Sequence, residues 1–265
     1  MSGHVGSLVA REDSGFTLLR LFSRRWILAS VLVVAAAAVM ARLGIWQLDR
    51  LAQRRLFNAR VQAQMAQPML ELNGATLNAG LTAMEYRAVL VRGEYDFDHQ
   101  VALRNQASSD NQPGVRLLTP LRIDGTDTYI LVDRGWVPGL ESTPQDWRQY
   151  DEPGIVEVRG IIRASQSRPD FGRRADPVPA PGEAPLRLWY FTNVEGIAGQ
   201  LPYKLLPVYI QQGPDPAWTS LPARSLPELD LTEGPHMGYA LQWFSFATLL
   251  LLGYPFYVRK RERNS

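Results

Sequence analysis

The stretch YALQWFSFATLLLLGYPFYV, residues 239–258, runs for twenty residues without a charged side chain. An α-helix rises about 1.5 Å per residue, so roughly twenty apolar residues cross the hydrocarbon layer of a bilayer, about 30 Å thick, with every backbone hydrogen bond made internally. The stretch therefore predicts a transmembrane helix over residues 236–258, with a basic tail over residues 259–265 after it.

A second apolar stretch lies near the other end of the chain, where residues 26–48 carry a single charge, Arg42. We expect a first transmembrane helix here, preceded by a tail over residues 1–25. The small residues at positions 36–41 also fit the cleavage site of a signal peptide. The apolar run continues beyond that site and exceeds the roughly 7–15 residues of a signal core, which favours a retained helix.

Basic residues flank the outer ends of both spans, although the formal net charge of the chain is only +2. They are Arg20, Arg24, Arg25, Arg259, Lys260, Arg261 and Arg263. Because basic flanks stay on the cytoplasmic side, both termini are predicted to be cytoplasmic and the region between the spans extracytoplasmic. Glu12 and Asp13 disfavour a mitochondrial transit peptide, so the expected location is a bacterial plasma membrane.

The region between the spans begins with a helical continuation and then changes character. Residues 49–67 lack Gly and Pro and are rich in good helix formers, so the first helix is expected to continue until Pro68 ends it. The short β-branched and aromatic runs that follow predict an antiparallel β-rich domain, a barrel or a sandwich, over residues 68–235. The expected strands cover residues 86–91, 101–104, 115–118, 128–132, 155–162, 188–192 and 205–211.

Turns and loops punctuate this domain. Residues 124–127 and residues 94–99, which end at His99, are expected to form hairpin turns. Two proline-rich loops are expected over residues 168–186 and 213–235. Arg134 stands between an apolar strand and a turn, where we expect a strand end and an ion pair with a carboxylate.

The residues that the chain lacks exclude several kinds of chemistry. With no cysteine, it has no disulfide, thiolate zinc site, thiol nucleophile or c-type haem attachment. It has no G-x-S-x-G elbow, P-loop lysine or G-x-G-x-x-G motif. We therefore expect neither an enzyme nor a nucleic-acid-binding protein.

His236 stands directly before the second span. At about 100° per residue, Tyr239, Ala240 and Trp243 share its helical face. One interpretation makes the histidine and the two aromatic residues interfacial anchors. The other makes His236 a ligand, because a neutral imidazole beside small and aromatic neighbours suits the iron of a porphyrin.

The predicted topology brings a second set of residues to the same depth. If the first helix leaves the membrane where the second enters it, Trp46, Gln47 and Arg50 lie level with His236. Arg50 could pair there with the propionate carboxylates of a haem or with lipid headgroups. The two helix ends would then form one site.

Five motifs occur in order between Gly44 and Trp243. They are Gly44-x-Trp46-Gln47-x-x-Arg50, Tyr86-Arg87-x-Val89-x-Val91-x-Gly93, Gly114-Val115-x-Leu117-Leu118-Thr119-Pro120, Val132-Asp133-Arg134-Gly135-Trp136-Val137-Pro138 and His236-Met237-x-Tyr239-Ala240-x-Gln242-Trp243. In these motifs and in its two-span layout, the chain resembles the surfeit locus protein 1 family, membrane proteins that assist assembly of haem-copper cytochrome oxidases. It departs from the family pattern at Asp133, usually asparagine, and at Gly234-Pro235, where an asparagine commonly precedes the histidine.

The resemblance implies an assembly factor. Some bacterial members bind haem a through the histidine that opens the second span, which here is His236, with the tryptophan two turns on, Trp243, lining the site. The expected cofactor site therefore comprises His236 as iron ligand with Trp243, Tyr239, Trp46, Gln47 and Arg50 around it. The expected partners are the oxidase catalytic subunit, haem a synthase and membrane lipid. The alternative is a scaffold that holds oxidase subunits without binding haem.

Overall fold

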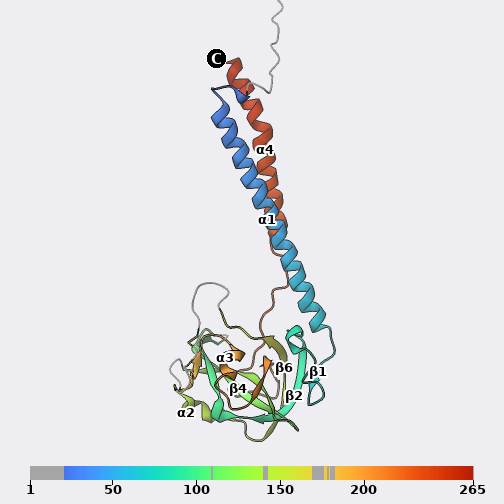
Figure 1. The fold of residues 1–265 in the computed structure, drawn as a ribbon, viewed down its shortest axis with the longest axis vertical. Helices are drawn as coiled ribbons and strands as arrows, with labels where there is room; N and C mark the ends of the chain where they lie inside the picture. Colours follow the sequence, from blue (N-terminus) through green and yellow to red (C-terminus); the bar gives the residue numbers. More distant parts are fainter. Residues whose placement is uncertain are drawn as a thin grey trace, which may run out of the picture. The chain divides into compact units, whose positions relative to one another are not determined.

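The computed structural model describes residues 21–108, 110–139, 143–168, 176–177, 179 and 183–264. The chain divides into two compact units, a helical unit of Met1–Asn58 with Leu231–Ser265 and a β-rich unit of Ala59–Asp230 (Figure 1). Most of the predicted tail over residues 1–25 and much of the predicted loop over residues 168–186 lie outside the described residues.

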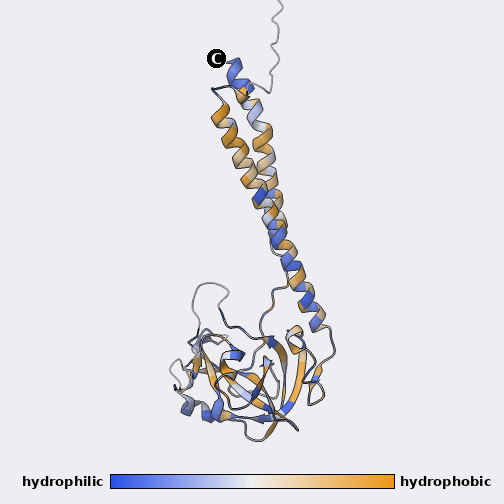
Figure 2. Cartoon of the chain, in the orientation of Figure 1, coloured by the Kyte–Doolittle hydropathy of each residue, from blue (hydrophilic) through white to orange (hydrophobic). Residues whose placement is uncertain are grey.

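Two long helices, α1 (Ile27–Met65) and α4 (His236–Arg263), run side by side in the helical unit (Figure 1). Helix α1 ends three residues before Pro68, close to the predicted stop, and α4 continues through the basic residues that follow position 258. Both are long and apolar enough to cross a membrane, and only 17% and 11% of their most apolar windows are buried (Figure 2). A core helix of a soluble protein would bury most of that surface, so the exposed apolar side chains suggest membrane association.

Within the helical unit the two helices meet along a seam with the spacing of a coiled coil. Buried or half-buried residues recur there at alternating intervals of three and four, which is the 3.5-residue period of left-handed packing. They are Trp26 just before α1, then Ser30, Val33, Ala37, Met40, Gly44, Gln47, Leu51, Arg54 and Asn58 on α1, and His236, Ala240, Trp243, Ala247, Leu250 and Tyr254 on α4. A Cβ added at Gly44 would lie 2.8 Å from the ring of Phe244, so glycine permits this close approach.

The β-rich unit is a closed barrel. Its strands are β1 (Leu70–Leu72), β2 (Ala88–Tyr95), β3 (Val101–Ala107), β4 (Pro113–Ile123), β5 (Thr128–Pro138), β6 (Ile155–Ala164), β7 (Leu188–Trp189) and β8 (Lys204–Gln212). They follow the order β1-β2-β6-β8-β5-β4-β3-β7, and an additional pairing of β2 with β4 closes a ring of five strands. The expectation of two apolar helices flanking a β-rich domain is confirmed, and of the two predicted forms the structure shows the barrel.

The strand directions are mixed. Most neighbours are antiparallel, but β1–β2, β3–β7 and β5–β8 are parallel pairs. The turn predicted at residues 124–127 is confirmed, since it joins the antiparallel strands β4 and β5. The hairpin predicted at residues 94–99 is wrong. Strand β2 pairs with β6 on one edge and with β1 and then β4 on the other, which leaves no edge for β3.

Three apolar clusters hold the barrel and its short helices together. The largest is built from β2, β4, β5, β6 and β8 and includes Val89, Leu121 and Ile210. A second packs α3 (Val194–Ala198) and β7 against β3, β4 and β5 around Trp189. A third surrounds Trp147 of α2 (Pro144–Trp147). Full burial of such large side chains, at about 25 cal/mol per Å² removed from water, makes the barrel the rigid part of the molecule.

Candidate functional site

His236 is held by a hydrogen bond across the helix seam. Its Nδ1 atom lies 2.8 Å from Oε1 of Gln47 on α1. Because a carboxamide oxygen only accepts, Nδ1 carries a proton, and in a neutral imidazole the lone pair is then on Nε2. Gly234, which has φ +67°, stands beside this nitrogen, and a Cβ there would lie 3.7 Å from Nε2. The glycine therefore leaves the ligating side of the ring less covered than any other residue would.

The structure brings together some of the predicted site residues and separates others. His236, Gln47 and Trp243 all occupy seam positions. Tyr239 was expected on the face of His236, but it lies beside the seam and is 49% exposed. Seam residues follow one another at intervals of three or four. From His236 the seam continues through Ala240, which is buried, and not through Tyr239.

Trp46 and Arg50 form a pair on the outward surface of α1. The Arg50 guanidinium carbon lies 5.5 Å from the centroid of the Trp46 ring, and its NH1 group donates to Oε1 of Gln53 at 3.1 Å. Trp46 is 41% exposed. This cation–π pair presents a positive charge and an aromatic edge to whatever surrounds the helix.

A set of polar contacts that the sequence did not reveal fastens the segment before α4 to α1. Nδ2 of Asn58 donates to the carbonyl oxygen of Leu231 at 2.6 Å, and Nε of Arg54 donates to that of Thr232 at 3.1 Å. Arg55 bonds both carboxylate oxygens of Glu233, at 2.7 and 2.9 Å. This hydrogen bond to Arg55 holds the pKa of the Glu233 carboxyl below its usual value. We call these contacts the clasp.

The clasp continues the helix seam in polar form. Gln47, Leu51, Arg54 and Asn58 follow one another at intervals of four, three and four, the same spacing as the seam residues before them. A polar residue at such a position fixes register. This spacing was the signal available in the sequence. It places Arg54 and Asn58, but not Arg55, on the side of α1 that carries the seam.

In the barrel, Arg134 is fully buried. Its guanidinium donates to Oε1 of Gln100 at 3.0 Å, to Oε1 of Glu152 at 2.9 Å and to the carbonyl oxygen of Tyr150. Burial raises the pKa of the Tyr95 hydroxyl, whose ring lies 5.0 Å from the guanidinium carbon. The predicted ion pair with a carboxylate is confirmed. The predicted strand end is wrong, because β5 continues through this residue to position 138.

The segment after β8 is tied to the barrel near Arg134. Arg224 donates to Oε2 of Glu152 at 2.8 Å and stacks at 3.8 Å on the ring of Trp218. The backbones of Ala223 and Trp136 exchange two hydrogen bonds, of 2.7 and 3.0 Å. We call residues 218–225 the strap. Part of the predicted proline-rich loop over residues 213–235 is therefore an ordered element of the barrel unit.

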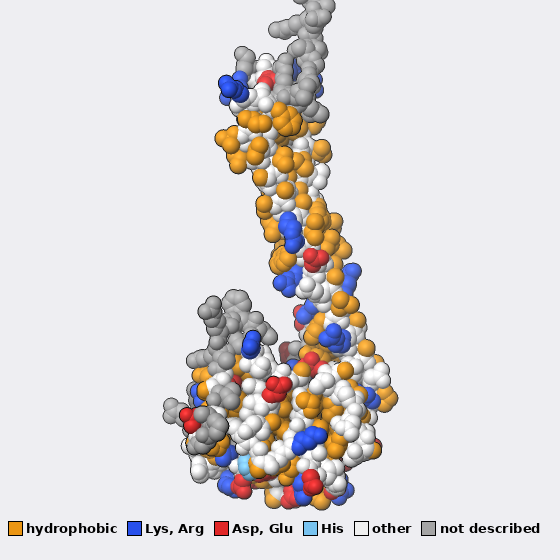
Figure 3. All heavy atoms as spheres, viewed as in Figure 1, with side chains coloured by type: hydrophobic (Ala, Val, Ile, Leu, Met, Phe, Trp, Pro, Cys, Tyr) orange, Lys and Arg blue, Asp and Glu red, His pale blue; other side chains and the backbone are white. Residues whose placement is uncertain are grey.

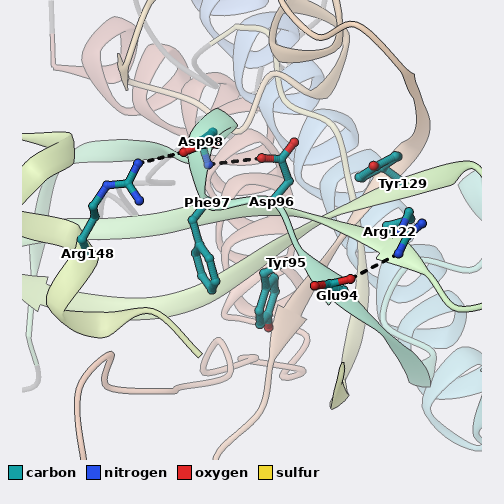
Figure 4. A pocket seen from close by; sticks show the side chains of 8 residues that line it. All are labelled: Glu94, Tyr95, Asp96, Phe97, Asp98, Arg122, Tyr129 and Arg148. Carbon is teal, nitrogen blue, oxygen red and sulfur yellow. Dashed lines mark hydrogen bonds and ion pairs between the residues drawn. The ribbon is translucent and has the colours of Figure 1, made fainter. Parts of the chain in front are cut away.

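A polar pocket of about 420 Å³ opens on the barrel (Figure 4). Its Glu94 pairs with Arg122 at 3.2 Å, and its Asp98 pairs with Arg148 at 2.8 Å. A third carboxylate, that of Asp96, accepts from Nδ1 of His99 and from the hydroxyl of Tyr203, both at 2.7 Å. Burial, followed by this bond to Asp96, raises the pKa of Tyr203. Each carboxylate thus has a partner, and across the described ranges no three His, Asp or Glu side chains gather as a metal site.

With this geometry in view, the chain was compared with known proteins. Residues 34–248 match the model of the SURF1 family. The chain belongs to the SURF1 family. It is 26% identical to a SURF1-like protein of Caenorhabditis briggsae, over 86% of this chain and 74% of that protein. It is also 26% identical to a SURF1-like protein of Rickettsia bellii, over 86% and 89%, and 24% identical to Surfeit locus protein 1 of Rattus norvegicus, over 76% and 66%.

The match to the SURF1 family covers both units. It takes in Gln47, His236 and Trp243 of the helix seam as well as Arg134 and Glu152 of the barrel. The helical unit thus holds one imidazole through Gln47, whereas the barrel contains a closed polar network around Arg134.

Proposed function

We propose that this SURF1-family chain is a membrane-bound assembly factor for a haem-copper cytochrome oxidase, which receives haem a at His236 and hands it to the catalytic subunit. Membership in the family and two apolar helices with exposed surfaces support this function. We further propose that haem a synthase delivers the cargo and that the protein resides in a bacterial plasma membrane.

The charge distribution supports one orientation for this proposal. Arg24 and Arg25 stand before α1, and Arg259, Lys260 and Arg261 stand in the last turns of α4. Both sets mark the same end of the helix pair, which is then cytoplasmic by the positive-inside rule. The other end of the helix pair, with His236, then faces outward, and so does the chain between the two spans, which forms the barrel.

The hydrogen bond between Gln47 and His236 carries the proposal. Histidines that ligate metals generally donate their other ring N–H to an oxygen, which fixes the ring and its tautomer. Gln47 does this here, and Nε2 of His236 is the atom that would hold the iron of haem a. Arg50, whose described side-chain hydrogen bond goes to the neutral amide of Gln53, is free to add a charged bond to a propionate.

A single protein ligand suits transfer better than storage. The residues around His236 bind and orient the cargo, while the apolar surfaces of α1 and α4 can bury its hydrocarbon tail, at roughly 0.8 kcal/mol per CH₂ group. One imidazole would supply a single protein ligand to the iron. An acceptor with a stronger ligand set can therefore remove the cargo.

The experiment is to co-express the full chain with haem a synthesis and to record the visible spectrum of the purified protein. We expect a Soret band that His236→Ala abolishes, while His99→Ala on the barrel leaves it intact. Gln47→Leu should weaken haem retention by about ten- to a hundredfold, since it removes the group that orients the ligand, whereas Gln62→Leu on the same helix should not. A colourless wild-type protein, or an unchanged band in His236→Ala, would leave the non-haem scaffold as the function.

A further inference from the structure

The helical unit contains a cavity far from His236. Apolar side chains from the first half of α1 and the last half of α4 line a space of about 470 Å³. The lining includes Val31, Val34, Ala35 and Ala38 of α1 with Leu251 and Pro255 of α4. We call it the groove. Figure 3 shows hydrophobic side chains over this end of the helix pair, with Lys and Arg side chains beyond them.

The groove has a built wall. Oγ of Ser30 donates to the carbonyl oxygen of Leu21 at 2.7 Å, and this bond holds residues 21–22 over the helix pair, where both line the groove. The hydroxyl of Tyr254 lies 2.9 Å from the same Oγ. Since the Ser30 proton is already donated to Leu21, Tyr254 is the donor to Ser30, and its hydroxyl also lies 3.4 Å from the carbonyl oxygen of Trp26. Both hydroxyl groups at the groove thus have hydrogen-bond partners, and the remaining lining is hydrocarbon.

The rim of the groove is basic. After residues 21–22 the chain turns, with the N–H groups of Trp26 and Ile27 both donating to the carbonyl oxygen of Ser23 at 2.9 Å. This turn carries Arg24 and Arg25 next to the wall. On the other helix, Arg259 follows Pro255 by one turn and so shares its face. Residues 21–48 contain no Asp or Glu, so no acidic side chain in the first half of α1 lies near Arg24 and Arg25 in the sequence; in α4, Glu262 stands three residues after Arg259.

We infer that the groove binds one acyl chain of an anionic phospholipid whose phosphate is held by Arg24, Arg25 and Arg259. A hydrocarbon slot with a cationic rim is complementary to a molecule that is apolar along its length and negative at its head. The tail of haem a fits less well, because Tyr254 lies about 27 Å along the helix from His236 at about 1.5 Å per residue. The inference does not depend on haem binding.

The test is native mass spectrometry of the full chain, purified in mild detergent and incubated with mixed micelles containing phosphatidylglycerol or phosphatidylcholine. We expect one phosphatidylglycerol retained per chain. Ala38→Phe should remove it by filling the groove, while Val39→Phe, on a neighbouring exposed residue that does not line it, should retain it. Arg24→Gln and Arg25→Gln should each reduce the preference for phosphatidylglycerol by about fivefold, and Arg92→Gln on the barrel should not.

Three outcomes would overturn the inference. One is equal retention of phosphatidylglycerol by Ala38→Phe and wild type, and another is equal binding of the two lipids by wild type. The third separates the groove from the haem proposal. Protein made in cells that lack haem a should still retain the lipid, and a groove that is filled only when haem a is present belongs to the tail of that cofactor instead.

Discussion

The two units of this protein use the same chemical pair in opposite environments. In the barrel, Arg134 has no exposed side-chain surface, and its partner Glu152 is 16% exposed. In the helical unit, Arg55 and Glu233 pair with about half of each side chain in solvent. Removing one member of a buried pair strands an uncompensated charge, whereas exposed pairs contribute little. The Arg134–Glu152 pair is thus a fixed contact, and the Arg55–Glu233 pair just before α4 is an exchangeable one.

The strongest way to break this contrast is to remove the buried guanidinium. We expect Arg134→Met to lower the free energy of unfolding by about 3 kcal/mol, because it leaves the Tyr150 carbonyl and one oxygen of Glu152 without their donor and removes one of the two donors to Oε1 of Gln100. Unfolding of the full chain in detergent micelles by denaturant, followed by tryptophan fluorescence, measures this loss.

The matched control is Arg159→Met, which removes an exposed arginine paired with Glu157 on β6. It should cost no more than about 1 kcal/mol. If the two substitutions cost the same, burial does not distinguish the two ion pairs.

Sequence patterns predicted most of this barrel because they report which face of a strand is buried. They did not reveal β1, whose three residues Leu70–Leu72 are too short to show alternation. They also did not reveal that β5 and β8 are parallel, since alternation gives a strand its faces but not its neighbours. Arg134 was placed at a strand end because it stands between an apolar run and a turn signal. Its partners come from positions 100, 150 and 152, and no local pattern connects these positions to it.

The candidate site shows a similar limit. The position of His236 and Trp243 on one helical face follows from spacing alone, and the structure places both on the seam. The clasp was missed because two of its acceptors are backbone carbonyls, those of Leu231 and Thr232, which leave no mark in the side-chain pattern. In the same part of α1, the charge of Arg50 was interpreted as a partner for lipid or propionate groups.

A second effect concerns the strap. Gly135 has φ +126°, and a Cβ there would lie 2.4 Å from the carbonyl oxygen of Ala223. Gly125 also has positive φ, +72°, but nothing lies within 4 Å of an added Cβ. Gly125→Ala therefore reports backbone strain alone, about 1–2 kcal/mol. We expect Gly135→Ala to cost about 1–3 kcal/mol more and to expose residues 218–225 to protease.

The comparison between the two glycines can fail in a clear way. Equal unfolding free energies for Gly135→Ala and Gly125→Ala, with the strap equally resistant to protease, would mean that the strap yields to the added methyl group. The strap would then be an exchangeable contact, like the Arg55–Glu233 pair, and not a fixed one like the Arg134–Glu152 pair.

The smallest expected effect lies inside the clasp, where a buried and an exposed side chain hold the same segment. Asn58 is 7% exposed and bonds the carbonyl oxygens of Leu231 and Thr232, so Asn58→Leu should cost about 1 kcal/mol and speed amide exchange at the start of α4. Arg55→Gln should change neither quantity measurably, because its ion pair with Glu233 competes with water on both sides. Hydrogen exchange of the Tyr239 amide, which donates to the carbonyl oxygen of Pro235, reads out both variants. Should Arg55→Gln loosen that amide as much as Asn58→Leu does, the exposed pair would be part of the fixed frame that positions His236, and exchangeable contacts would have to be sought elsewhere on the seam.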